Sequence, residues 1–193
     1  MDEAMATALE QGVSAELLLV SERFVEIHAE DLLELRELCP DAIEIVCFAN
    51  DLFHRLAGTK TPQGVILVAR RPEPADFTRL RGSKRLIVLD RVQDPGNVGT
   101  LIRLAAALAF DGLILLRGSA DPYDEKVLRS TMGTGFKLGL VTDVSWTEAS
   151  VWLREAGFTI YVADMGGTAA SKTSFRKQAA LVLGNEGNGV SED

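Results

Sequence analysis

The sequence predicts an α/β protein in which a mostly parallel sheet has helices on both faces, preceded by a small α/β domain. After residue 84, short apolar runs alternate with amphipathic segments, a pattern typical of strands and helices in a parallel sheet. Before that point, Arg70-Arg-Pro-Glu-Pro74 places two prolines within three residues, which is typical of a linker. A hydrophobic content of 47% and a charged content of 25% indicate a globular chain.

The first part of the chain mixes helical and extended patterns. Leu32, Leu35 and Leu38 recur at helical spacing, whereas residues 65–69 form an apolar, β-branched run that predicts a buried strand. The patterns predict helices at residues 2–11, 29–38 and 50–57, and strands at residues 15–20, 43–46 and 65–69. We therefore expect a small domain at residues 1–72, followed by a linker at residues 73–84.

The second part, residues 85–193, alternates more regularly. Its patterns predict strands at residues 86–89, 113–116, 138–141, 159–163 and 180–183. They predict helices at residues 100–109, 124–132 and 147–156. Because helices separate most of these apolar strands, the strands are expected to run parallel within one sheet.

Charge is unevenly distributed along the chain. The net charge is −8; residues 1–75 hold fourteen acidic and six basic residues, and the remainder holds fourteen of each. Six of the basic residues fall between positions 70 and 85, which favours nucleic-acid binding, although a solvated linker explains the same cluster. The overall acidity argues against non-specific binding to nucleic acid.

The sequence also indicates a compartment. No apolar run approaches the length of a membrane span, and no basic stretch with an apolar core marks a signal peptide. Cys39 and Cys47 lack metal-type spacing and are expected to be reduced, buried thiols, while His28 and His54 are isolated. We expect a cytoplasmic protein that has no membrane segment and binds no metal.

The first candidate site is the turn Asp94-Pro-Gly-Asn-Val-Gly99, which follows an apolar strand. Open α/β sheets bind ligands at the carboxyl ends of their strands. We expect Asn97 to cap the next helix, and the glycines to let the backbone approach a ligand. Arg103 lies in an otherwise apolar helix, where a buried guanidinium needs an anionic partner. Without Arg103, a capped turn with no ligand would be the simpler interpretation.

The second candidate site is Leu181-Val-Leu-Gly-Asn-Glu-Gly-Asn-Gly-Val190, which places three glycines within six residues after an apolar strand. Such a run suits a backbone cradle around a ligand, in which Glu186 would pair with a cation. A flexible hairpin-like loop is the alternative. A third segment, residues 121–133, places Asp124 at a helix start and Arg129 near its end, as in any capped helix. No spacing matches a dinucleotide fingerprint or a Walker loop.

Residues 89–107 resemble the first motif of the SpoU/TrmH family of RNA ribose methyltransferases, and residues 183–190 resemble the second. Residues 118–133 resemble the family's segment between these motifs. The resemblance is strong over residues 84–193. It is weaker over residues 1–70, which resemble the family's small RNA substrate-binding domain, with Thr61-Pro-Gln-Gly64 leading into its last strand.

The resemblance implies a SPOUT-type fold with a trefoil knot, a homodimer, and methyl transfer from S-adenosyl-L-methionine to a ribose 2′-hydroxyl in ribosomal or transfer RNA. The residues that it implies for catalysis are Asn97, Arg103 and Glu186. Those implied for the methyl donor are Ala163, Asp164, Gly184, Asn185 and Gly187. The residues expected to contact RNA are Arg55, Lys60 and Arg129. Since arginine stays protonated at neutral pH, we expect Arg103 to grip a phosphate and stabilise alkoxide charge rather than act as a base.

The sequence departs from the family pattern at both ends. Residues 1–193 lack the family's third motif, and the strand that usually precedes the first helix is missing. We therefore expect this polypeptide to bind S-adenosylmethionine weakly or not at all, and tight binding in a calorimetric titration would overturn that expectation. A non-catalytic RNA-binding module is the main alternative function. A nucleotide-dependent oxidoreductase is disfavoured because the glycine fingerprint is missing.

Overall fold

The computed structural model describes residues 3–11, 13–39, 43–71, 73–74, 76–185, 187 and 189–191. The chain divides into two compact units, Met1–Pro72 and Glu73–Asp193. Part of the predicted linker folds as the 3₁₀ helix η1 (Phe77–Leu80), which begins where the Asp76 side chain accepts a hydrogen bond from the Thr78 N–H. Leu80 is buried, so this segment belongs to the second unit.

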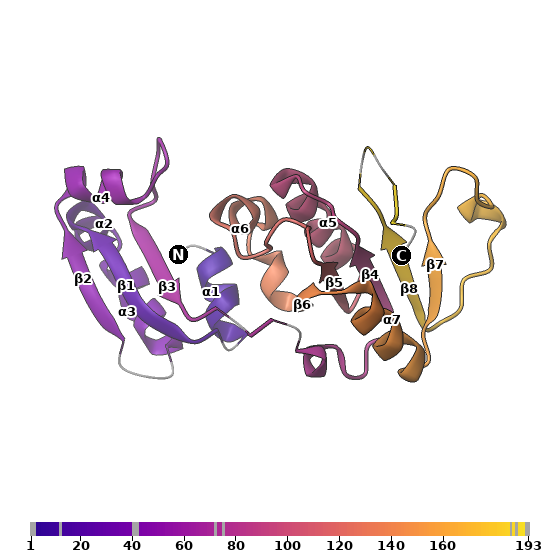
Figure 1. Ribbon diagram of the computed structural model, residues 1–193. Helices are drawn as coiled ribbons and strands as arrows, with labels where there is room; N and C mark the ends of the chain where they lie inside the picture. Colours follow the sequence, from indigo (N-terminus) through magenta and orange to yellow (C-terminus); the bar gives the residue numbers. More distant parts are fainter. Residues whose placement is uncertain are drawn as a thin grey trace. The chain divides into compact units, whose positions relative to one another are not determined.

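The first unit is a small α/β sandwich of one sheet and four described helices (Figure 1). Its helices are α1 (Glu3–Glu10), α2 (Glu22–Ile27), α3 (Ala29–Leu38) and α4 (Asn50–Leu56). Its strands are β1 (Ala15–Ser21), β2 (Glu44–Phe48) and β3 (Val65–Ala69), in the order β2-β1-β3. Strand β1 runs parallel to β2 and antiparallel to β3. Sequence patterns missed α2, which Ser21 caps by accepting a hydrogen bond from the Phe24 N–H.

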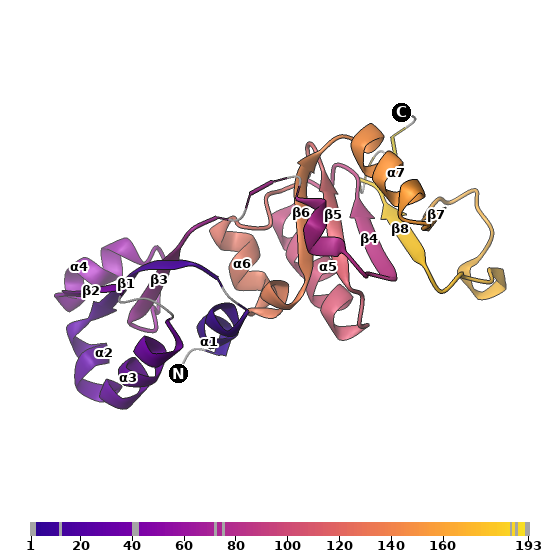
Figure 2. The same cartoon turned by 90° about the horizontal axis from the view of Figure 1, so that it is seen from below.

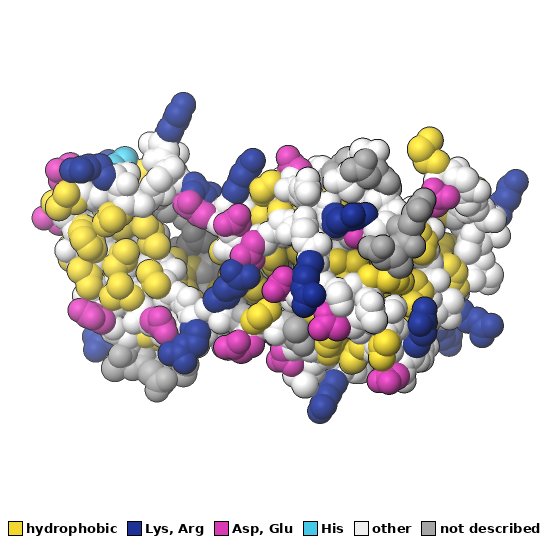
Figure 3. Space-filling model, in the orientation of Figure 1, with side chains coloured by type: hydrophobic (Ala, Val, Ile, Leu, Met, Phe, Trp, Pro, Cys, Tyr) yellow, Lys and Arg dark blue, Asp and Glu magenta, His cyan; other side chains and the backbone are white. Residues whose placement is uncertain are grey.

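The sheet of the first unit has one covered face and one open face. Leu18, Val20 and Phe24 are buried in one cluster, and α2 and α3 lie on one side of the strands (Figure 2). On the other side, Leu19 is paired with Val46 on β2 and Ile66 on β3, and all three are only partly buried. Figure 3 shows hydrophobic side chains gathered on this unit. Apolar side chains on this second face are therefore only partly covered.

The second unit confirms the predicted α/β fold with a parallel sheet. Its strands are β4 (Arg85–Leu89), β5 (Gly112–Leu116), β6 (Gly139–Val144), β7 (Thr159–Val162) and β8 (Ala179–Leu183). Its α-helices are α5 (Pro95–Ala107), α6 (Glu125–Thr131) and α7 (Trp146–Glu155), with 3₁₀ helices η2 (Thr134–Lys137) and η3 (Ala170–Lys172). The sheet order is β6-β5-β4-β8-β7, and every pair is parallel.

Helices cover both faces of this sheet because alternate strand residues point to opposite sides. Leu86 and Val88 of β4 pack in one cluster with residues of α7, whereas Ile87 and Leu89 pack in another with residues of α5 and α6. Strands that are buried on both faces have no polar face, which explains why they appear in the sequence as continuous apolar runs.

The strand order reverses between β4 and β8. From β4 the chain adds β5 and then β6 in one direction, and after α7 it crosses to β7 at the opposite edge. Strand β8 then returns to lie between β7 and β4, with Leu89 opposite Leu183. Ligands of open α/β sheets bind where the strand order reverses, so the fold places a candidate site beyond Leu89 and Leu183.

Three local expectations were wrong: the start of α5, the role of Gly99 and the burial of Cys47. Helix α5 begins at Pro95 rather than residue 100, so the predicted turn is the first turn of that helix. Gly99 faces α6: a Cβ there would lie 1.6 Å from Ser130 Oγ, so this glycine serves helix packing and not the approach of a ligand. Cys39 is buried, as expected, and burial raises the pKa of its thiol. Cys47 is exposed, because it occupies a partly open strand of the small sheet.

Candidate active site

The two sequence motifs meet at the carboxyl edge of the parallel sheet, where β4 and β8 lie side by side (Figure 1). The Asp90 N–H donates to the Leu183 carbonyl over 2.9 Å, and this bond extends the ladder beyond the strands. The Asn185 Nδ2 then donates to the Arg91 carbonyl over 3.0 Å. Arg91 has a left-handed backbone with φ of 54°. These bonds join loops that are separated by about half of the chain.

Asp90 forms a second link between the same segments. Sequence patterns did not identify this residue. It is 2% exposed, and its Oδ2 accepts from the Ser191 N–H over 2.6 Å and from the Ser191 Oγ over 2.7 Å. The guanidinium of Arg91 lies 3.5 Å from the other carboxylate oxygen. The sequence does show a charged residue directly after an apolar strand, which could have marked Asp90. Its hydrogen-bond partner Ser191, however, lies 101 residues away.

Replacing Asp90 with alanine is expected to lower the free energy of unfolding by about 2–3 kcal/mol, because two charge-assisted hydrogen bonds are lost and the partly buried Ser191 N–H loses its acceptor. Asp90→Asn keeps an acceptor oxygen and should lose less. Urea unfolding of both variants and the parent chain measures the difference. An Asp90→Ala chain as stable as the parent would show that the link to Ser191 contributes nothing.

Backbone hydrogen bonds close the chain after β8 into a tight turn. Asn185 and Gly189 exchange two backbone hydrogen bonds of 2.9 Å each, and the Gly187 N–H donates to Asn185 Oδ1 over 2.9 Å. A Cβ on Gly184 would lie 2.2 Å from the backbone carbon of Gly189, so only glycine fits at position 184. Glu186, which was expected to act in catalysis, lies outside the described residues.

The start of α5 corrects the expected cap. Asp94, not Asn97, is the N-cap, and its Oδ1 accepts from the Gly96 N–H over 2.6 Å and the Asn97 N–H over 3.0 Å. Pro95 occupies the first helical position, where its missing N–H costs nothing. Asn97 lies in the first turn of α5 and is exposed. Its side chain is therefore presented at the sheet edge that carries the Gly184 loop.

Arg103 is exposed on α5, so its guanidinium is not buried among the apolar residues of this helix. Its helix buries Val98, Ile102 and Ala105 against the sheet, and Arg103 occupies the outer surface. Among the described residues, no carboxylate forms an ion pair with it. The guanidinium is therefore accessible to an external anion, and no contact in the described structure joins it to Asn97 or to the Gly184 loop.

Ala163 and Asp164 follow β7, the neighbour of β8, so they lie at the same sheet edge as Gly184. The Ala163 N–H donates to the Val182 carbonyl over 3.0 Å, and Asp164 accepts from Gly166 in the turn that follows. Both residues are exposed. The structure thus brings the expected donor residues onto two adjacent strand ends.

This edge suits the chemistry of S-adenosylmethionine, which combines a flat purine, ribose hydroxyls and a positively charged sulfur. Val162 at the end of β7 is 51% exposed and Met165 is fully exposed, so apolar surface is available for the purine. Asp164 supplies a carboxylate suited to hydroxyl groups or positive charge. Among the described residues, the one atom that a Cβ on Gly187 would meet is Asn185 Oδ1, at the ordinary contact distance of 3.5 Å.

The residues expected to contact RNA are placed separately. Arg129 of α6 is paired with Glu125 one helical turn earlier. Asp124, the N-cap of that helix, makes no side-chain cap hydrogen bond, contrary to expectation. Arg55 of α4 and Lys60 of the loop before β3 are exposed and belong to the first unit.

No helix among the described residues is long and apolar enough to cross a membrane. No group of His, Cys, Asp and Glu side chains in the described part of the chain is arranged to hold a metal ion.

Comparisons with known proteins agree with the sequence motifs. The chain is 32% identical over 168 residues to the 23S rRNA (guanosine(2553)-2′-O)-methyltransferase RlmP of Bacillus subtilis, covering 86% of this chain. It is 31% identical over 193 residues to the mitochondrial rRNA methyltransferase 3A of Danio rerio. The crystal structure of the SpoU methyltransferase AviRb from Streptomyces viridochromogenes, in complex with AdoMet, matches with a TM-score of 0.84 and 30% identity. That match covers 98% of this chain and 73% of AviRb.

The match to the Bacillus subtilis enzyme spans 65% of that protein, and the match to the Danio rerio enzyme spans 40%. The model of the SpoU rRNA Methylase family matches residues 84–193. This range includes both motif loops and every described strand of the parallel sheet. The resemblance seen in the motifs is confirmed. The chain belongs to the SpoU rRNA methylase family.

Proposed function

We propose that the protein is an S-adenosylmethionine-dependent methyltransferase that modifies a ribose 2′-hydroxyl of RNA. The observation that carries the proposal is the parallel pairing of β4 with β8, which brings the two family motifs together at one strand-order reversal. The names of the relatives favour ribosomal over transfer RNA as the substrate. The knot and the homodimer that the family resemblance implies belong to the same proposal.

When bound, S-adenosylmethionine supplies a methyl group activated by positively charged sulfur. The residues proposed to hold it are Ala163, Asp164, Gly184, Asn185 and Gly187. The turn closed by Asn185 and Gly189 fixes the backbone of this set, and the bond from Asn185 to the Arg91 carbonyl fixes it against β4. A donor pocket of this kind is built from main-chain groups, which hold their geometry better than long side chains.

Arg103 and Asn97 are proposed to act on the RNA. The planar guanidinium of Arg103 donates two parallel hydrogen bonds to a phosphate, and its charge stabilises negative charge that develops on O2′. It does not accept the hydroxyl proton, which passes to another base or to water. Asn97 presents an amide at the same sheet edge as the donor residues, and Glu186 is assigned by motif to organise the centre.

The test is methyl transfer by the chain to unmodified ribosomal RNA, at a saturating concentration of radiolabelled S-adenosylmethionine so that weak donor binding does not mask the reaction. Alkaline hydrolysis then locates the label, since a 2′-O-methyl group blocks cleavage of the adjacent phosphodiester bond. Label in alkali-resistant dinucleotides supports the proposal. RNA binding without methyl transfer or donor binding would instead support a non-catalytic RNA-binding module.

A further inference from the structure

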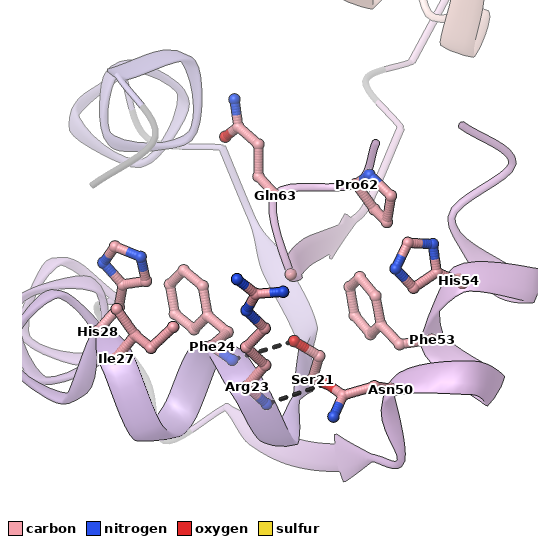
Figure 4. Close-up of a pocket in the computed structure, with 11 residues that line it drawn as sticks. Ser21, Arg23, Phe24, Ile27, His28, Asn50, Phe53, His54, Pro62 and Gln63 are labelled. Carbon is pink, nitrogen blue, oxygen red and sulfur yellow. Dashed lines mark hydrogen bonds between the residues drawn. The ribbon is translucent and has the colours of Figure 1, made fainter. Parts of the chain in front are cut away.

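The first unit contains a pocket that the proposed catalytic centre does not use. It has a volume of 340 Å³ and lies where α2, α4 and the loop before β3 meet (Figure 4). Figure 4 shows His28 and His54 at opposite ends of the pocket, with the Arg23 guanidinium between the rings of Phe24 and Phe53 in this view. Pockets for small ligands begin at about 300 Å³, so this one accommodates a single small, flat group.

The pocket is held in shape by contacts among its own walls. The Ser21 N–H donates to the Gly64 carbonyl over 2.8 Å, and Gly64 has φ of +95°. A Cβ on Gly64 would lie 2.8 Å from Ser21 Oγ and 2.9 Å from the Phe24 Cβ. Asn50 Oδ1 accepts from the Arg23 backbone N–H over 3.0 Å, which joins α4 to α2. The glycine of the Thr61-Pro-Gln-Gly64 segment is thus explained by close packing at the pocket floor.

The pocket walls differ in charge from the rest of the unit. Residues 1–72 contain thirteen acidic and six basic residues, yet the described residues that line the pocket include Arg23, His28 and His54 and no carboxylate. Just outside the pocket, Asp31 Oδ2 lies 3.1 Å from His28 Nδ1, and this contact orients the imidazole ring. A cation with no acidic wall opposite favours an anionic ligand.

The walls also offer flat surfaces. The ring of His28 stacks on Phe24 with centroids 5.0 Å apart and an angle of 28° between the planes. The floor is apolar, because Phe24 and Phe53 are both buried. Unpaired RNA bases stack on histidine and aromatic rings and on guanidinium planes, while arginine binds the attached phosphate.

We propose that this pocket binds one unpaired nucleotide of an RNA, with the base against the imidazole rings and the phosphate on Arg23. The proposal rests on the proposed function, because it takes RNA as the substrate. Arg55 follows His54 directly, and Lys60 lies two residues before Pro62, so two of the three residues expected from the sequence to contact RNA are neighbours in sequence of the pocket lining. The small unit would then select a loop or bulge in the RNA rather than a regular duplex.

The two histidines of the chain both line this pocket, so their ring signals in NMR spectra report on it directly. The chain, labelled with ¹³C at histidine, is titrated with a short single-stranded RNA of mixed sequence and with the same strand in a duplex. Both histidine signals should shift with the single strand and much less with the duplex. Uridine monophosphate should move them more than inorganic phosphate, because phosphate offers no base to stack.

Arg23→Ala should weaken binding of the single-stranded RNA about tenfold, the loss expected for one charge-assisted contact. The variant keeps the Arg23 backbone N–H that donates to Asn50, so its thermal midpoint should stay unchanged. Arg36→Ala, on the exposed surface of α3 and outside the pocket lining, is the matched control and should bind like the parent.

Three results would overturn the pocket proposal. They are RNA binding with unshifted histidine signals, equal affinities of the Arg23→Ala and Arg36→Ala chains, and equal shifts with inorganic phosphate and uridine monophosphate. None of them decides the proposed function, which is judged by donor binding and by methyl transfer at the sheet edge of the other unit. Conversely, if the chain transfers no methyl group but its histidine signals shift with RNA, the proposed enzymatic function is wrong and the proposed RNA-binding pocket stands.

Discussion

Replacing Arg103 with lysine is expected to lower methyl transfer to RNA by about 100-fold or more, which is the loss seen when a preorganised donor is removed from a developing anion. Lysine keeps the positive charge but cannot donate two parallel hydrogen bonds to a phosphate. Because Arg103 is exposed and no described carboxylate pairs with it, the folded state should lose little stability. The expected loss therefore belongs to the substrate and not to the fold.

Steady-state kinetics and thermal unfolding of the Arg103→Lys chain separate these contributions. A lower kcat indicates that the guanidinium stabilises charge in the transition state, whereas a higher KM with unchanged kcat indicates a grip on the phosphate alone. Arg154→Lys, at an exposed position near the end of α7, is the matched control and should transfer methyl groups like the parent. Near-normal turnover of Arg103→Lys would refute a role that depends on the shape of the guanidinium.

The parallel sheet was predictable from sequence because its strands are buried on both faces. Such strands must be apolar at every position, so β4 and β5 stand out from the segments around them. Helix α3 was predicted with its observed bounds, since its leucines recur at the helical period. Helix α2 was not, because its six residues are too few to establish a period between β1 and α3.

The start of α5 shows how a local signal was misread. Asp94 and Asn97 are both good caps, and the sequence pattern alone favours neither. Pro95 decides between them, because proline is preferred at the first helical position and Asp94 immediately precedes it. That proline was visible in the sequence, so the observed boundary was available without the structure.

The closure of the site could not be predicted in the same way. Ser191 donates to Asp90, 101 positions earlier, and Asn185 donates to the Arg91 carbonyl, 94 positions earlier. No periodicity carries information over that distance, and only the order of strands in the sheet brings these residues together. The family motifs identified which loops matter, while the physical reason for their adjacency is the return of β8 beside β4.

Replacing Gly184 with alanine is expected to disrupt the candidate donor site more than any other change of one methyl group in this loop. The added Cβ would lie 2.2 Å from the Gly189 carbon and 2.3 Å from the Val190 nitrogen. Both are backbone atoms, so no side chain can rotate away, and the paired bonds between Asn185 and Gly189 must break. Overpacking of this kind costs about 1–3 kcal/mol, which the free energy of unfolding in urea should show.

Gly187→Ala is the matched control for stability, since it adds the same methyl group to the same turn. Its Cβ would meet Asn185 Oδ1 at 3.5 Å, an ordinary contact, and no other atom of the described residues, so the free energy of unfolding should change by less than about 0.5 kcal/mol. If Gly184→Ala unfolds like Gly187→Ala, the tight turn is not required by the fold. If Gly184→Ala is destabilised and also loses S-adenosylmethionine binding in calorimetry, the turn that closes β8 against β4 is the element that shapes the donor site.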